Sequence, residues 1–92
     1  MKYTAHVIIS GKVQGVWFRA NTKNKADQLG IMGWVKNTPD GNVEAFFEGE
    51  KDRVDDIIEW CHHGPSQAQV RNVKCERRQI TSNKFKKFFI KY

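Results

Sequence analysis

The chain has 92 residues, which is enough for one domain and too few for a second core. Hydrophobic residues make up 39% of it and only two residues are cysteine, so we expect an apolar core without a disulfide framework. The formal net charge of +6 favours an anionic partner, and charge alone does not separate nucleic acid, acidic lipid and phosphorylated metabolites. No apolar stretch approaches the roughly 20 residues of a membrane span.

The chain begins with a predicted strand, loop and helix. Residues 3–10 hold a cluster of β-branched and aliphatic side chains, which predicts a central strand. Residues 11–16 contain two glycines and predict a loop. A helix over 18–29 follows, because apolar or small residues recur there every three or four positions. These residues are Phe18, Thr22, Ala26 and Leu29.

The next segment predicts a β-hairpin. Residues 32–36 form a short strand, and residues 42–48 alternate in the two-residue period of a second strand. Between them, residues 38–41 read Thr-Pro-Asp-Gly, which places proline and glycine where tight turns use them.

A second helix and two strands complete the prediction. Residues 51–63 carry an apolar stripe with the spacing of a helix. The stripe consists of Val54, Ile57, Ile58 and Cys61. Residues 69–77 predict a fourth strand whose irregular apolar spacing indicates a β-bulge or an irregular start. A turn at 82–83 leads to a last strand over 85–92.

This order predicts an α+β fold of the form βαββαβ with an extra strand at the C-terminus. Each helix has one apolar stripe, so both helices must cover the same face of a sheet. Right-handed crossovers then give a ferredoxin-like sandwich. We expect an antiparallel core sheet in the order fourth, first, third, second strand, with the extra strand at an edge. In this topology the loop 11–17, the start of the first helix and Asn37 become neighbours.

Two segments at that meeting point carry candidate binding groups. The stretch 11–19 is a glycine-containing loop that enters a helix, where backbone N–H groups and the helix dipole favour an anion. Arg19 adds a planar fork for two phosphate oxygens. Taken alone, this stretch is an ordinary strand–helix loop, since it matches neither a Walker loop nor a dinucleotide fingerprint. The stretch 33–43 with Asn37 is, taken alone, an ordinary hairpin.

Together, the two stretches resemble the signatures of the acylphosphatase family. Residues 11–19, Gly-Lys-Val-Gln-Gly-Val-Trp-Phe-Arg, resemble the first signature, Gly-x-Val-Gln-Gly-Val-x-Phe-Arg. Residues 33–49 resemble the second, which is Gly-aromatic-Val-Lys-Asn, three residues, Gly-x-Val, five residues, Gly. Every fixed position is filled, and the resemblance extends over essentially the whole chain as a single domain, 1–92. Two long patterns in the right order are a specific signal.

The resemblance implies an enzyme that hydrolyses the carboxyl–phosphate bond of an acyl phosphate, without a metal or cofactor. Arg19 would bind the charged phosphate oxygens, and Asn37 would orient the attacking water; these two are the catalytic residues. The backbone of the substrate-binding loop would cradle the phosphate, and it comprises Gln14, Gly15, Val16, Trp17 and Phe18. The leaving carboxylate is a stable anion, so catalysis reduces to positioning and electrostatic stabilisation.

The resemblance and composition also imply the setting of the reaction. We expect a small-molecule acyl phosphate as substrate, with inorganic phosphate as product and competitive inhibitor. We expect a cytoplasmic monomer with no nucleic-acid or membrane partner. One position departs from what is frequent in the family, because Trp17 stands where a small residue, commonly glycine, is usual. The indole either narrows the pocket, shields it from water or covers the core.

Two other functions remain open on the residues alone. The C-terminal segment alternates lysines with phenylalanines, as a stacking platform for single-stranded nucleic acid does. These residues are Lys84, Phe85, Lys86, Lys87, Phe88, Phe89 and Lys91. An edge strand protected by lysines accounts for the same pattern and is our preferred interpretation. RNA-recognition domains share this sandwich, but the chain lacks their Lys/Arg-Gly-Phe-Gly/Ala-Phe run. A catalytically silent family member is the third reading, and intact Arg19 and Asn37 argue against it.

Cysteine and histidine residues offer a metal site that we do not expect to exist. Cys61 lies on the apolar stripe of the second helix and Cys75 at an apolar strand position, so both are predicted core thiols. The adjacent His62 and His63 point in different directions around a helix. A disulfide between the two cysteines is conceivable, but a reducing cytosol disfavours it.

Three further polar residues are candidates for a role near the site. His6 is expected to be a satisfied histidine within the first strand and not a catalytic base. Lys12 and Lys36 flank the predicted site and are candidates for steering anionic substrates, or are simply solubilising surface lysines.

Overall fold

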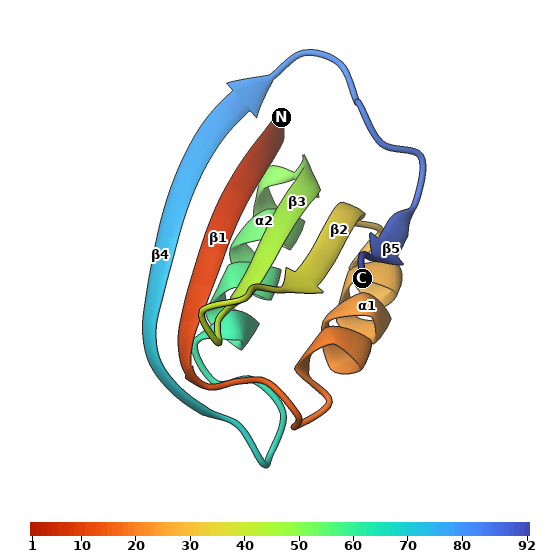
Figure 1. Cartoon of the computed structure of the whole chain (residues 1–92). Helices are drawn as coiled ribbons and strands as arrows, with labels where there is room; N and C mark the ends of the chain where they lie inside the picture. Colours follow the sequence, from red (N-terminus) through yellow and green to blue (C-terminus); the bar gives the residue numbers. More distant parts are fainter.

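A computed structural model describes residues 1–92 and contains five strands and two helices. In chain order they are β1 (Lys2–Lys12), α1 (Phe18–Leu29), β2 (Met32–Asn37), β3 (Val43–Glu50), α2 (Lys51–Cys61), β4 (Gln69–Ile80) and β5 (Phe88–Ile90). All five strands belong to one sheet in the order β4-β1-β3-β2-β5. Both helices lie on the same side of that sheet and leave its other face open (Figure 1). Neither helix has the length and apolar character that a membrane span requires.

The predicted order of the four core strands and the edge position of the fifth are confirmed. β1 pairs antiparallel with β3 and β4, and β2 pairs antiparallel with β3. The predicted antiparallel core is therefore confirmed, and the extra strand β5 runs parallel to β2. β4 ends where β1 and β2 begin, and residues 81–87 cross over at that end of the sheet (Figure 1). The chain must therefore enter β5 in the direction of β2.

Some strands begin or end at other residues than predicted, because pairing with a neighbouring strand sets their length. β1 extends to Lys12 and β4 to Ile80, because these two strands pair along nearly their whole lengths. The predicted irregularity in β4 is confirmed. Ser10 of β1 pairs with Asn72 and the next residue, Gly11, pairs with Val70, so β4 has one extra residue at this point. β5 is shorter than the predicted strand over 85–92.

The core lies between the sheet and the two helices. Alternate residues of the central strands enter it, namely Ala5, Val7 and Ile9 of β1 and Val43, Ala45 and Phe47 of β3. The helices contribute the predicted stripes, with Phe18, Thr22 and Ala26 from α1 and Val54, Ile57, Ile58 and Cys61 from α2. Two helices with one apolar stripe each thus cover one face of the sheet, as their spacing predicts.

Gly33 sets how closely β2 approaches β3. Its φ is +131°, and a Cβ atom there would lie 1.8 Å from the carbonyl oxygen of Phe46. Any other residue would both strain the backbone and push the two strands apart. The first glycine of the second signature therefore has a structural role, in the strand that ends at Asn37.

Candidate active site

The loop between β1 and α1 is anchored to the core by its apolar residues. Val13, Val16 and Phe18 are buried, and the ring of Phe18 packs 5.4 Å from that of Trp60. Between these anchors, Gly15 and Trp17 are exposed. The apolar positions of the first signature thus hold the loop in place while the intervening backbone stays at the surface.

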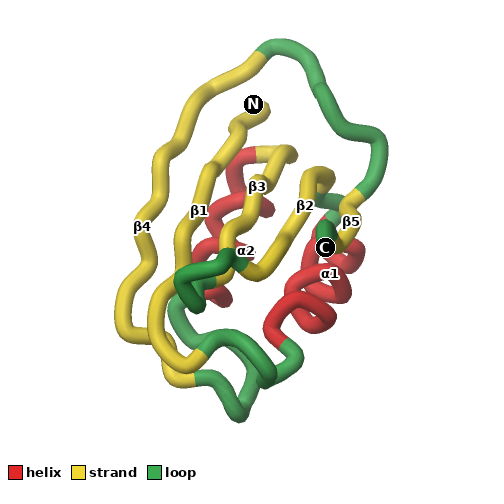
Figure 2. The backbone as a smooth tube through the Cα atoms, in the orientation of Figure 1, coloured by secondary structure: helices red, strands yellow, loops and turns green.

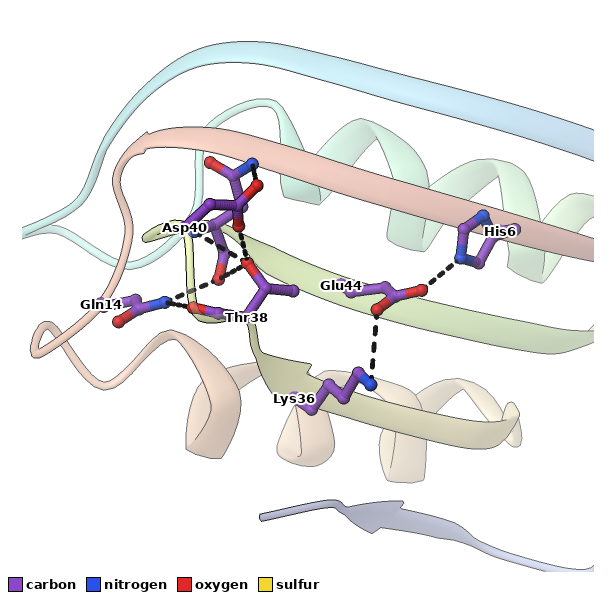
Figure 3. Close-up of polar contacts among 7 residues, drawn as sticks. His6, Gln14, Lys36, Thr38, Asp40 and Glu44 are labelled. Carbon is purple, nitrogen blue, oxygen red and sulfur yellow. Dashed lines mark hydrogen bonds and ion pairs between the residues drawn. The ribbon is translucent and has the colours of Figure 1, made fainter.

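Gln14 joins this loop to the hairpin. Its Nε2 donates hydrogen bonds to the carbonyl oxygens of Thr38 and Asn42, both at 2.8 Å (Figure 3). The loop and the β2–β3 turn lie at the same end of the sheet, as the green segments in Figure 2 show. The side chain of Gln14 therefore holds the loop next to the residue that ends β2, Asn37. Sequence reasoning missed this bond, because no periodicity or charge pattern links position 14 to position 38.

The start of α1 has the features of an anion site. Trp17 is the N-cap residue with φ 67° and ψ 22°, no side chain caps the helix, and its first turn contains no acidic residue. The first N–H groups of a helix lack partners within the helix and carry partial positive charge. Gly15 has φ +74°, and a Cβ atom there would meet nothing within 4 Å. The backbone before the helix therefore borders open space.

A hollow of about 270 Å³ joins these elements. It is lined by Val13, Gly15, Trp17, Phe18, Arg19, Ala20, Asn37, Ile90 and Tyr92. The structure thus brings the two predicted catalytic residues, Arg19 and Asn37, to one cavity, as the topology predicted. Ile90 and Tyr92 reach the same cavity from β5 and the residues after it, a position that the sequence did not reveal.

Asn37, which lines this hollow, has an unpaired hydrogen-bond acceptor. Its Oδ1 is buried and has no hydrogen-bond partner, and it is the only buried side-chain nitrogen or oxygen in that state. An unsatisfied buried polar atom costs about 1–3 kcal/mol. Buried polar atoms are therefore normally paired with protein or ordered water. A bound water or ligand in the hollow would supply the missing partner.

The guanidinium group of Arg19 forms no ion pair with an acidic side chain. The residue is half-buried, and none of the ion pairs of the protein includes it. Its guanidinium carbon lies 5.1 Å from the centre of the Tyr92 ring. An arginine without an acidic partner beside an uncapped helix start provides charge and bidentate geometry for an oxyanion.

Other candidate residues lie away from the hollow. Lys36 pairs with Glu44 at 3.6 Å, and Glu44 also bonds the ring of His6 at 2.6 Å across the open face (Figure 3). His6 is therefore a satisfied sheet histidine, as expected. Of the predicted loop residues, Gly15, Trp17 and Phe18 line the hollow, whereas Gln14 and Val16 do not.

The cysteine and histidine residues are not arranged as metal ligands. No three residues among histidine, cysteine, aspartate and glutamate come together as a group that could hold a metal ion. Cys61 and Cys75 are both free thiols, and burial raises the pKa of each. His62 bonds the Ile58 carbonyl within its own helix at 3.0 Å.

The aromatic residues near the C-terminus pack on the protein itself. Phe88 is buried and stacks on Phe47 with ring centres 5.9 Å apart. Phe85 lies 5.6 Å from Phe46 and 6.4 Å from Phe89. Rings that a single-stranded nucleic acid would stack on are in contact with one another, which favours the edge-strand interpretation.

A larger hollow lies beside the end of β4 but lacks comparable chemistry. It has a volume of about 540 Å³ and includes Glu48, Glu76, Arg78 and Lys84 in its wall. Its charges are of both signs, and the carboxylate of Glu48 already accepts backbone N–H groups. Volume alone therefore does not mark the functional site.

Comparison with known proteins identifies the family. A family model described as acylphosphatase matches residues 5–90. The chain belongs to the acylphosphatase family. It is 48% identical over 92 residues to the acylphosphatase of Geobacter sulfurreducens, covering all of both chains. It is 54% identical over 70 residues to the acylphosphatase of Rubrobacter xylanophilus, which covers 76% of this chain and 64% of that protein.

The acylphosphatase fold is confirmed by a solved structure as well. The crystal structure of acylphosphatase from Bacillus subtilis matches with a TM-score of 0.92 at 30% identity, over 98% of this chain and 99% of that one. The family and its hydrolase class, predicted from two signatures, are therefore confirmed. The roles of Arg19 and Asn37 stay a prediction.

Proposed function

We propose that the chain hydrolyses an acyl phosphate in the hollow of about 270 Å³, with Arg19 holding the phosphate and Asn37 positioning the water. One observation supports this proposal above the others. Arg19, which has no acidic partner, and Asn37, whose buried Oδ1 has no hydrogen-bond partner, line the same cavity at the start of a helix that no side chain caps. The arginine and the helix start suit a phosphate, and the amide oxygen suits a water molecule.

The phosphoryl group occupies the space in front of the loop 14–18. The N–H groups of this loop and of the first turn of α1 donate to the phosphate oxygens, and Arg19 grips two of them. Gly15 permits close approach, because its missing Cβ leaves that space open. These donors stabilise the charge that spreads over the equatorial oxygens in the transition state.

The water is held by Oδ1 of Asn37, which accepts one of its hydrogen bonds. A lone pair of the water oxygen then faces phosphorus, opposite the acyl oxygen. A bond forms from the water oxygen to phosphorus, and the bond from phosphorus to the acyl oxygen breaks with its electron pair on the carboxylate. An acyl phosphate dianion and water thus give a carboxylate and a dihydrogen phosphate monoanion, so both water protons end on the phosphate. A carboxylate needs no acid to leave, so no protein acid takes part.

The first prediction separates the two roles by substitution. Arg19→Ala should lower kcat/KM for acetyl phosphate by about 100-fold or more, because it removes charge stabilisation in the transition state. It should also weaken competitive inhibition by inorganic phosphate. Asn37→Ala should lower kcat by about 100-fold and leave phosphate inhibition within about threefold, because water and not phosphate is its ligand. Steady-state kinetics with a chelator present measures both constants.

Arg53→Ala is the matched control, because Arg53 is an exposed arginine of α2 outside the hollow. It should keep the wild-type rate. The assignment fails if the Arg19 and Asn37 variants fold, as judged by circular dichroism, and hydrolyse acetyl phosphate as fast as the wild type. A folded wild type without any hydrolysis would instead identify a catalytically silent family member.

A further inference from the structure

Two exposed aromatic side chains frame the same hollow. Only three large hydrophobic residues are exposed in the whole molecule, and two of them, Trp17 and Tyr92, line this cavity. These two residues are 73% and 98% exposed. Single exposed apolar residues are ordinary, but two aromatic rings at the mouth of one pocket indicate a binding surface.

The backbone of Trp17 holds its indole at the surface. It is the only residue other than glycine with a positive φ, in a region where a bulky side chain is strained. The turn is fixed by Asn21, whose backbone N–H and side-chain Nδ2 both donate to the Trp17 carbonyl, at 3.0 and 2.8 Å. A tryptophan that is 73% exposed does not cover the core, which removes one of the three roles that the sequence left open for it.

The hollow consequently has a polar side and an apolar side. Arg19, Asn37 and the start of α1 form the polar side. Trp17, Tyr92 and Ile90 supply apolar surface next to them, and the Tyr92 ring lies over the Arg19 guanidinium at 5.1 Å. An acyl phosphate has the same division, with a charged phosphate at one end and an acyl group at the other.

We propose that Trp17 and Tyr92 form an acyl-group subsite that favours acyl phosphates with a planar aromatic acyl group over small aliphatic ones. This inference rests on the proposed function, because it places the phosphate against Arg19. A planar ring in the subsite contacts the indole and the phenol in offset or edge-to-face geometry, which aromatic pairs prefer. These contacts lie away from the reacting phosphorus, so they act through binding energy remote from the chemistry.

The test compares two substrates across matched variants. We measure kcat/KM for benzoyl phosphate and for acetyl phosphate with the wild type, Trp17→Gly and Tyr92→Ala. The benzoyl-to-acetyl ratio should fall about threefold to tenfold in each variant, the size expected for one lost aromatic contact. Comparing ratios cancels the intrinsic reactivities of the two substrates. Trp17→Phe and Tyr92→Phe keep a ring and should retain most of the wild-type ratio.

A binding measurement tests the subsite without turnover. Calorimetry with phenylphosphonate and methylphosphonate should show tighter binding of the phenyl compound to the wild type and a loss of this preference in Trp17→Gly and Tyr92→Ala. If both variants keep the wild-type preference in kinetics and binding, the subsite is wrong while the hydrolase assignment stands. If the wild type hydrolyses neither acyl phosphate, the proposed function is wrong, and the phosphonate preference still decides the subsite.

Discussion

The carboxamide of Gln14 spans the gap between two segments that carry separate parts of the proposed chemistry. Gln14 lies in the loop before α1, and its Nε2 donates hydrogen bonds to the carbonyl oxygens of Thr38 and Asn42 in the hairpin. Asn37 immediately precedes this turn, and Arg19 lies two residues past the loop. The distance between the proposed phosphate site and the proposed water site therefore depends on this neutral side chain.

The second prediction concerns Gln14→Glu, a change that keeps the size of the side chain and replaces its donors by oxygens. The carboxylate oxygen that replaces Nε2 would then face the carbonyl oxygens of Thr38 and Asn42, and the repulsion should move the loop away from the hairpin. We expect a loss of about 1–3 kcal/mol in the free energy of unfolding, because two half-buried hydrogen bonds are lost. We expect kcat/KM to fall about tenfold or more, because the site geometry loosens.

Urea unfolding and steady-state kinetics measure these two effects. Gln28→Glu on the exposed face of α1 makes the same chemical change outside the site and should leave both quantities near wild type. A Gln14→Glu protein with normal stability and normal turnover would show that the bond does not set the geometry.

At the residue scale, the sequence predicted those site residues that belong to a recognisable motif or whose position follows from the order of the elements. Arg19 and Asn37 stand at fixed positions of long patterns, and the element order places both at one end of the sheet. The bond of Gln14 and the positions of Ile90 and Tyr92 depend on tertiary contacts that carry no periodicity. The left-handed backbone of Trp17 is unexpected for the opposite reason, since local preference would place glycine there.

At the element scale, β5 depends on one carboxylate. Glu48 of β3 is only 1% exposed, and its oxygens accept N–H groups of Lys84 and Phe85 at 3.0 Å. These contacts hold the segment 81–87, which connects β4 to β5. β5 itself is an edge strand of three residues. The contacts also explain why the predicted last strand over 85–92 is too long, because the backbone around Phe85 bonds Glu48 and not β2. Both helices, in contrast, carry strong periodic stripes and begin where the sequence predicts.

The third prediction concerns Glu48→Gln. The amide keeps the size of the side chain but has no charge and only one acceptor oxygen. The N–H groups of Lys84 and Phe85 make three contacts with the two oxygens of the carboxylate, and these contacts would be weakened. We expect a loss of about 1–3 kcal/mol in the free energy of unfolding. Because Ile90 and Tyr92 follow this segment and line the hollow, kcat/KM for benzoyl phosphate should fall as well.

Urea unfolding, together with limited proteolysis within residues 81–87, measures the release of this crossing. Glu59→Gln on the exposed face of α2 is the control and should leave proteolysis unchanged. Equal cleavage rates in the wild type and Glu48→Gln would contradict an anchoring role for the carboxylate.

At the scale of the whole molecule, the helix layer is tied to the edge of the sheet by Asp55. This residue of α2 pairs with Lys51 at 3.0 Å in its own helix and with Arg77 of β4. Hydrogen bonds from Lys51 and then Arg77 hold the pKa of Asp55 below its ordinary value. A lowered pKa in the folded state means that the charged form is the one that stabilises the fold.

The fourth prediction follows from the sign of that shift. The stabilisation is fully present above the pKa of an unfolded aspartate, roughly 3.9, and is lost as the pH falls through the lower folded value. Asp55→Asn should therefore destabilise the protein by about 0.5–1 kcal/mol at pH 7, a modest amount because solvent screens this partly exposed pair. The difference from wild type should vanish at acidic pH below the folded pKa.

Urea unfolding at neutral and acidic pH gives both differences. Asp56→Asn is the matched control, since Asp56 is exposed on the same helix and belongs to no ion pair. A destabilisation by Asp55→Asn that is equally large at both pH values would show that the charge of Asp55 is not the cause.

The central position of β1 also has a consequence for how the molecule assembles. β1 precedes both of its partner strands in the chain, and its Lys2 pairs with Glu50 on one side and with Ile80 on the other. Pairings between residues so distant in the chain require long loops to close first, and such topologies fold slowly. A growing chain therefore exposes one unpaired edge of its first strand until β4 has been synthesised. The hollow with Arg19, Asn37 and Tyr92 is complete only once residues 90–92 have taken their places, so the proposed active site requires β5 to have docked beside β2.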